Sequence, residues 1–96
     1  MSPKNKKKLD LIRIKLDKLD DKLLPLIKYR TQLVKEVLKL KETKKEIVDK
    51  KRINFILAKI KKKSKRLNID TKITYRIWKN MIWSYIDFER RNFKKK

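Results

Sequence analysis

Apolar residues recur every three or four positions through the first 40 residues of the chain, which is the spacing of a buried helical face. Arg30 interrupts this seam, because it stands where the spacing calls for an aliphatic side chain. The spacing therefore predicts a long helix with an arginine inside its apolar face. The residues that keep the pattern are Leu9, Ile12, Leu16, Leu19, Leu23, Leu26, Leu33, Val37 and Leu40.

This first helix is predicted over residues 4 to about 42, and Pro25 lies inside it. We expect a kink at Pro25 and not a break, because the seam keeps its phase on both sides and no turn-forming residue flanks the proline. A helix of this length measures about 57 Å. A globule of 96 residues is only roughly 33 Å across. The helix must therefore project, and an antiparallel homodimer is the simplest way to cover its seam.

Two shorter helices are predicted after it. Asp49 is a suitable N-cap for the second, and residues 68 to 70 form the next connection, with Asp70 as the cap of the third. No segment has the alternating pattern of a strand, so the chain is predicted to be all-α. The expected organisation is a basic tail at residues 1–8, one helical domain at 9–92 and a second basic tail at 93–96.

The charge and composition limit the possible functions. A net charge of +21 points to nucleic acid or an anionic membrane surface. However, the lysines surround every predicted helix, so we expect no nucleic-acid partner. No apolar run is long enough for a membrane span or a signal-peptide core. The chain has no cysteine or histidine, which excludes disulfides and Ser/His catalysis and is compatible with the predicted cytoplasmic location.

The cations of the first helix have informative spacings. Arg30 and Lys41 are eleven residues apart, which puts them about 20° from eclipsed and about 16 Å apart along one helix. Arg13 is about 25 Å from Arg30, but an antiparallel partner could bring its own Arg13 close. No acid stands four residues from Arg30, so a bound carboxylate is a candidate counter-charge. Alternatively, Arg30 is a surface residue, and Arg13 pairs only with Asp17.

The order and spacing of five residues resemble the all-helical chorismate mutase family, and the similarity extends over about residues 9 to 90. These residues are Arg13, Arg30, Lys41, Asp49 and Arg52; Met81, Ile82, Tyr85 and Glu89 continue the match. The resemblance implies an intertwined homodimer of three-helix subunits. It also implies conversion of chorismate to prephenate by a Claisen rearrangement, in phenylalanine and tyrosine biosynthesis, without a metal or cofactor.

The resemblance also implies roles for individual residues. Arg13 of one subunit would bind the substrate carboxylates together with Arg30 and Arg52 of the other. Lys41 and Glu89 would donate hydrogen bonds to the ether oxygen, where negative charge grows as the bond breaks. Because only a protonated Glu89 can donate, we expect activity to fall above neutral pH, and Glu89→Gln to flatten this profile.

Two positions depart from the family pattern. Ile53 stands where many members have a glutamate that binds the substrate hydroxyl, so Asp49 or its backbone is expected to meet that hydroxyl. Tyr85 replaces a common serine and is a candidate substrate contact. The remaining alternatives are an isochorismate pyruvate lyase of the same fold, a basic nucleic-acid-binding protein, and a coiled-coil dimerisation module with no active site.

Overall fold

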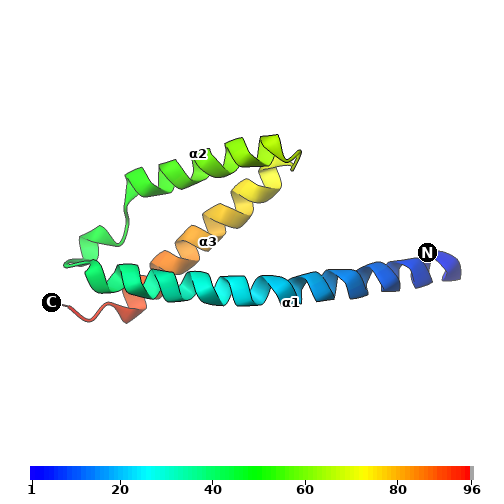
Figure 1. The fold of residues 1–96 in the computed structure, drawn as a ribbon, viewed down its shortest axis with the longest axis horizontal. Coiled ribbons are helices and arrows are strands. Elements are labelled where there is room, and N and C mark those ends of the chain that lie inside the picture. Colours follow the sequence, from blue (N-terminus) through cyan, green and yellow to red (C-terminus); the bar gives the residue numbers. More distant parts are fainter. Residues whose placement is uncertain (96) are drawn as a thin grey trace. The chain divides into compact units, whose positions relative to one another are not determined.

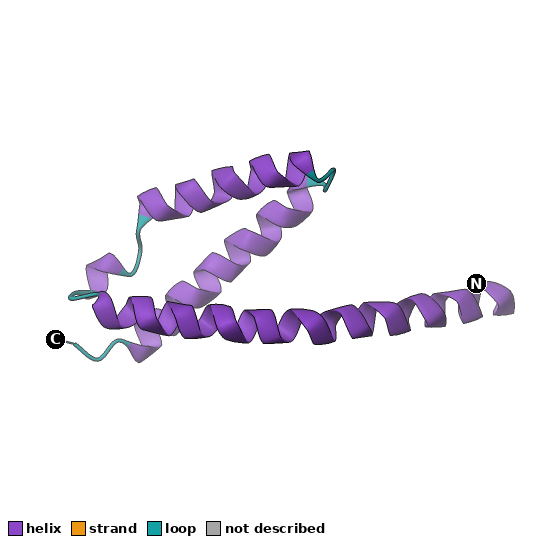
Figure 2. Ribbon diagram, viewed as in Figure 1, coloured by secondary structure: helices purple, strands orange, loops and turns teal. Residues whose placement is uncertain are grey.

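The computed structural model describes residues 1–95, and its elements are all helical (Figures 1 and 2). They are α1 (Pro3–Leu40), the short 3-10 helix η1 (Lys44–Glu46), α2 (Lys50–Arg66) and α3 (Thr71–Asn92). No strand occurs in this described range, so the predicted all-α class is confirmed. The chain divides into two compact units, Met1–Leu33 and Val34–Lys96, called here the N-terminal and C-terminal units.

Helix α1 continues through Pro25, so the prediction of one helix is confirmed. It ends at Leu40, slightly earlier than predicted. The amide of Lys41 donates to the carbonyl of Leu38 at 3.2 Å, a bond of the 3-10 type that closes the last turn. Lys41 is therefore the first residue after the helix.

The seam of the N-terminal unit is uncovered. None of the α1 residues, all of which the structure describes, is buried. The seam residues Leu16 and Leu19 are each 53% exposed, and Leu26 is 64% exposed. A row of half-exposed aliphatic side chains is unusual on a solvated helix and is typical of a face that binds another surface.

The C-terminal unit has its own small core. Ile47, which follows η1, is buried together with Ile82 and Ile86 of α3. The partly buried residues packed against these three come from the last turn of α1, from the loop before α2, from α2 and from the end of α3: Leu38, Val48, Ile53, Ile56, Leu57 and Phe93. This core fixes the end of α1 to α3.

Caps determine where α2 and α3 begin and end. Asp49 accepts a hydrogen bond from the amide of Arg52 at 3.0 Å, and Asp70 accepts one from Lys72 at 2.8 Å, so both predicted N-caps are confirmed. Helix α2 ends in a Schellman motif, in which Asn68 has a positive φ of 58° and the amide of Ile69 donates to Ser64 at 2.9 Å.

A buried pair of hydroxyls joins α2 to α3. Ser64 is 3% exposed and Thr74 is 8% exposed, and their side-chain oxygens are 2.7 Å apart. Ser64 also donates to the carbonyl of Ile60 at 2.7 Å. Since both hydroxyls have partners, the pair fixes the contact between the helices without an unsatisfied polar group.

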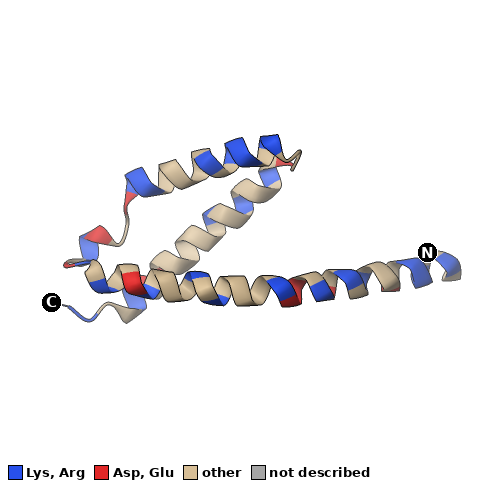
Figure 3. Ribbon diagram, in the orientation of Figure 1, with Lys and Arg blue, Asp and Glu red and all other residues tan. Residues whose placement is uncertain are grey.

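The basic residues are dispersed. Lys and Arg lie on each of the three α-helices (Figure 3). Within the described range, no helix is both long enough and apolar enough to cross a membrane.

Candidate active site

A buried ion pair between Lys41 and Glu89 is the centre of the candidate site. The Lys41 Nζ atom lies 3.1 Å from Oε1 and 3.1 Å from Oε2 of Glu89. The side chains are only 18% and 7% exposed. Lys41 follows α1 directly and Glu89 is on the last turns of α3, so the C-terminal ends of these two helices meet at this pair.

The position of Glu89 follows from the spacing of α3. Ile82, Ile86 and Glu89 are four and three residues apart, so they share one helical face, and all three are buried. A carboxylate buried among aliphatic side chains would cost several kcal/mol if it were unpaired. Lys41 provides the counter-charge, which makes the burial of Glu89 tolerable.

The pair leaves hydrogen-bonding capacity for a ligand. An ammonium group has three N–H donors, and at most two of them are used by the two oxygens of the Glu89 carboxylate. The third donor is available to an acceptor atom. In this arrangement both Glu89 oxygens act as acceptors, so the donor that the site offers is the ammonium of Lys41.

The C-terminal segment contacts the backbone beside Lys41. Lys95 donates from Nζ to the carbonyl of Lys39 at 2.6 Å and to the carbonyl of Lys41 at 2.9 Å. Lys95 was predicted only as part of the basic tail at residues 93–96. In a chain so rich in lysine, neither its type nor its spacing distinguishes it from its neighbours.

The loop after Lys41 contains Glu46, whose pKa is shifted by its hydrogen bonds. The N–H groups of Thr43 and Glu42 donate to the Glu46 carboxylate and lower the pKa of Glu46 below its usual value, and the charge of Lys41 is a smaller cause. Desolvation of the Glu46 carboxylate acts in the opposite direction but does not reverse the shift. The Thr43 bond measures 2.8 Å and holds the loop next to the ion pair.

Asp49 and Arg52 have local partners on α2. Asp49 is occupied as the N-cap, and the Arg52 guanidinium carbon is 5.5 Å from the centre of the Phe55 ring. In the part of the chain that the structure describes, neither side chain is hydrogen-bonded to Lys41 or Glu89.

The remaining predicted site residues lie on α1 and α3. Arg13 is exposed and Arg30 is partly buried, and both belong to the N-terminal unit. Seventeen residues of helix separate them by about 25 Å, so one chain cannot bring both to a small ligand. Tyr85 is partly buried and lies one turn before Glu89 on α3.

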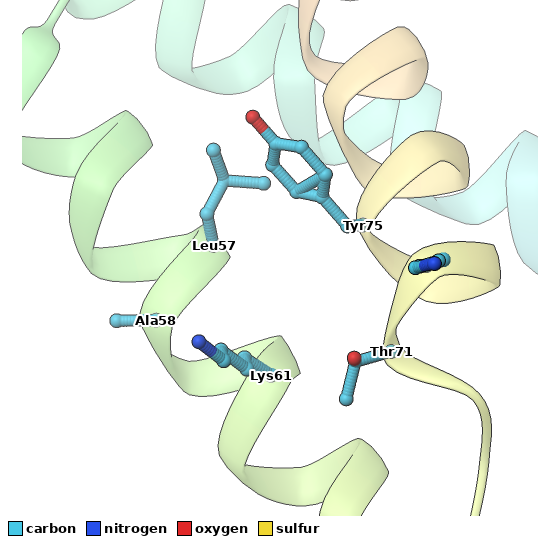
Figure 4. A pocket seen from close by; sticks show the side chains of 6 residues that line it. Leu57, Ala58, Lys61, Thr71 and Tyr75 are labelled. Atoms are coloured by element: carbon cyan, nitrogen blue, oxygen red, sulfur yellow. The ribbon is translucent and has the colours of Figure 1, made fainter.

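A concave surface lies between α2 and α3 (Figure 4). It has a volume of about 400 Å³ and a mostly apolar lining of Leu57, Ala58, Lys61, Thr71, Lys72 and Tyr75. It contains none of the predicted site residues, and its two lysines are exposed. We therefore place the candidate active site at the ion pair and not in this groove.

The acidic residues do not form a metal site. Among residues 1–95, no group of three or more acidic side chains is placed to hold a metal ion.

Comparison with known proteins identifies the family. The family model described as chorismate mutase type II matches residues 12–90, which include all seven predicted site residues. No curated protein and no solved structure matches the chain. The match supports chorismate mutase activity and does not favour the isochorismate pyruvate lyase alternative. The chain belongs to the chorismate mutase type II family, a family of all-helical isomerases.

Proposed function

We propose that this chain rearranges chorismate to prephenate at a site centred on Lys41 and completed by a second copy of the chain. The observation that carries this proposal is the buried Lys41–Glu89 pair, in which an ammonium is held in place with one donor left for the substrate. The family match over residues 12–90 supplies the reaction.

The reaction suits a site made of cations. In this rearrangement the ether C–O bond breaks while a C–C bond forms within the same molecule, so no nucleophile is consumed. Negative charge grows on the ether oxygen as that bond lengthens. The third N–H of Lys41 would donate to this oxygen, and the low local polarity around the buried pair would strengthen the bond.

The carboxylates of the substrate require several cations. Arg30 and Arg52 of one copy are proposed to bind them together with Arg13 of the other copy. Guanidinium groups suit this task because each can donate two parallel hydrogen bonds to a carboxylate. Holding both ends of the substrate favours the compact conformer that reacts.

The exposed seam of α1 supports the second copy. Its leucines are about half exposed in one chain, and a homodimer would remove them from water. An antiparallel arrangement of two α1 helices also brings Arg13 of one copy towards Arg30 of the other. Both needs, an apolar cover and a third guanidinium, are met by the same assembly.

Three α2 and α3 residues complete the proposed site. Glu89 would donate to the ether oxygen when its carboxyl is protonated, and Glu89→Gln provides a permanent N–H donor at the same place. The side chain of Asp49 already accepts the Arg52 amide, so its second oxygen is the proposed acceptor for the substrate hydroxyl, which Ile53 cannot bind. Tyr85 is proposed to contact the ring of the substrate.

The direct experiment is an assay of the purified chain with chorismate, in which the loss of substrate absorbance and the formation of prephenate are followed. We expect turnover by the wild type and a large loss in Arg30→Ala. Isochorismate is the second substrate to be tested. A wild-type chain that consumes neither compound would contradict the proposed function.

Mixing two inactive variants tests the shared site. In a heterodimer of Arg13→Ala and Arg30→Ala, one site has both arginines and the other has neither. Random mixing should therefore restore about a quarter of wild-type activity, because half of the dimers are mixed and half of their sites are intact. Restoration is not expected if both arginines act within one chain.

Location and nucleic-acid binding remain predictions. The cytoplasm is the proposed location, because a biosynthetic isomerase of this family needs its substrate there. Weak DNA retention that disappears at physiological salt would agree with the dispersed cations, whereas saturable and tight retention would favour the nucleic-acid alternative.

A further inference from the structure

Lys95 occupies an unusual place at the end of α1. The last four carbonyls of a helix have no partner within the helix. Lys39 provides one of these carbonyls, and the Lys95 ammonium donates to it at 2.6 Å. The same ammonium donates to the carbonyl of Lys41 at 2.9 Å. It therefore joins the last turn of α1 to the first residue beyond the helix.

From these bonds we propose that Lys95 is a positioning residue for Lys41, an inference that rests on the proposed function. The two carbonyls that it binds, of Lys39 and Lys41, lie on either side of the peptide bond between Leu40 and Lys41. Fixing both carbonyls fixes the Cα atom of Lys41, from which the side chain reaches Glu89 at 3.1 Å. The Lys95 side chain is called here the clamp, because it holds the backbone from which the catalytic ammonium of Lys41 projects.

The charge of Lys95 suits this position. A cation at a helix C-terminus interacts favourably with the negative end of the helix dipole. Its other contact is weak, because the Glu42 carboxylate is 4.0 Å away and 80% exposed. The hydrogen bonds to the backbone are therefore the main interaction of the Lys95 side chain.

Both packing and hydrogen bonds connect the C-terminal segment to the rest of the C-terminal unit. Phe93 packs against the core, and the chain is extended there, with φ −72° and ψ 123°. A groove of about 310 Å³ lies beside it, between Lys35 and Leu38 of α1 and Phe88 of α3. The bonds from Lys95 join the end of this segment to the end of α1.

The test compares Lys95→Met, which keeps the stem but cannot donate, with Lys94→Met as a matched control. We expect kcat for chorismate to fall about three- to tenfold in Lys95→Met, with KM changed less than about twofold, because misplacing a catalytic donor affects the transition state most. Lys94→Met should match the wild type. Lys95→Arg should recover most of the lost kcat, because a guanidinium also donates.

Three results would overturn the inference: an unchanged kcat in Lys95→Met, an equal loss in Lys94→Met, or no recovery in Lys95→Arg. Assays are run well below the unfolding temperature of each variant, which is measured in parallel, so that a loss of kcat is not a loss of folded protein.

Amide hydrogen exchange separates this inference from the proposed function. Lys95→Met, but not Lys94→Met, should accelerate exchange in residues 41–46. If the wild type fails to convert chorismate, the proposed function fails, and faster exchange would still support the clamp. If the wild type is active and neither exchange nor kcat responds to Lys95→Met, the clamp fails alone.

Discussion

The N-terminal and C-terminal units use the same three-four spacing of apolar residues with opposite results. In the N-terminal unit the seam leucines are about half exposed, and no residue of α1 is buried. In the C-terminal unit the same spacing buries Ile82, Ile86 and Glu89. The spacing therefore identifies the apolar face of a helix, but not whether the same chain buries that face.

The difference also separates the parts of the candidate site. The C-terminal unit contains a complete ion pair, with the donor and its acceptor from one chain. The N-terminal unit carries Arg13 and Arg30, which one helix holds about 25 Å apart. Four variants, one of them double, test this division.

Charges in the α1 seam should have the largest effect. Leu16→Glu combined with Leu23→Glu would bury two carboxylates in the proposed dimer interface, so we expect a monomer and a loss of activity of at least about a hundredfold. Light scattering after gel filtration measures the oligomeric state, and the chorismate assay measures the activity. Lys28→Glu is the control, because it changes the net charge equally on the opposite face of α1. An active dimer of the double variant would contradict the role of the seam.

Loss of the Lys41 ammonium should reduce activity without changing the oligomeric state, and it should also lower stability, because Glu89 is then buried without a counter-charge. Lys41→Met removes the donor to the ether oxygen, and we expect kcat to fall about 10²- to 10³-fold. The exposed Lys45→Met provides the control. The size of the particle should stay that of the wild type, in contrast to the seam variant. A kcat within about threefold of the wild type would remove Lys41 from the mechanism.

The hydroxyl pair between α2 and α3 tests stability in the C-terminal unit. Ser64→Ala removes the partner of the buried Thr74, so we expect the free energy of unfolding to fall by about 1–2 kcal/mol. Ser84→Ala is a matched control, because Ser84 bonds the carbonyl four residues back in the same way but is exposed. Ser84→Ala should lower the free energy of unfolding, measured with urea, by less than about 0.5 kcal/mol. Equal losses would mean that burial of the pair adds nothing.

Glu46→Gln should have the smallest effect, and one that depends on pH. Hydrogen bonds from the Thr43 and Glu42 amides lower the folded-state pKa of Glu46, so its charged form stabilises the fold above the unfolded-state pKa. This contribution is lost as the pH falls through the lowered pKa. The difference in unfolding midpoint between wild type and Glu46→Gln should therefore shrink from pH 7 to pH 3. A difference in unfolding midpoint that stays constant with pH would contradict a contribution from the charged Glu46 carboxylate.

Much of the fold was predictable because its signals are local. Asp49 and Asp70 cap helices by bonding amides two or three residues away, and the continuation of the seam past Pro25 predicted a single first helix. The end of α1 was less predictable. Leu40 precedes more lysine and glutamate, which have good helix propensity, and the helix stops there without glycine or proline.

The candidate site was predictable only through the resemblance. Lys41 is one of many lysines, and Glu89 differs from other acids of the chain only by its burial. Their meeting joins residues 48 positions apart in the sequence, which no local spacing indicates. The hydrogen bonds from Lys95 to the end of α1 join residues even farther apart in the sequence, and no sequence pattern predicts them.

The sequence alone determined the three helices, their caps and the apolar faces, because each depends on residues within one or two turns. Only the tertiary structure decided which of these faces one chain covers, and which lysine meets the buried carboxylate. Burial and ion pairing depend on distances between segments that are remote in sequence. The cost of removing a charge from water is offset by contacts with such segments, and these contacts form only when the chain folds.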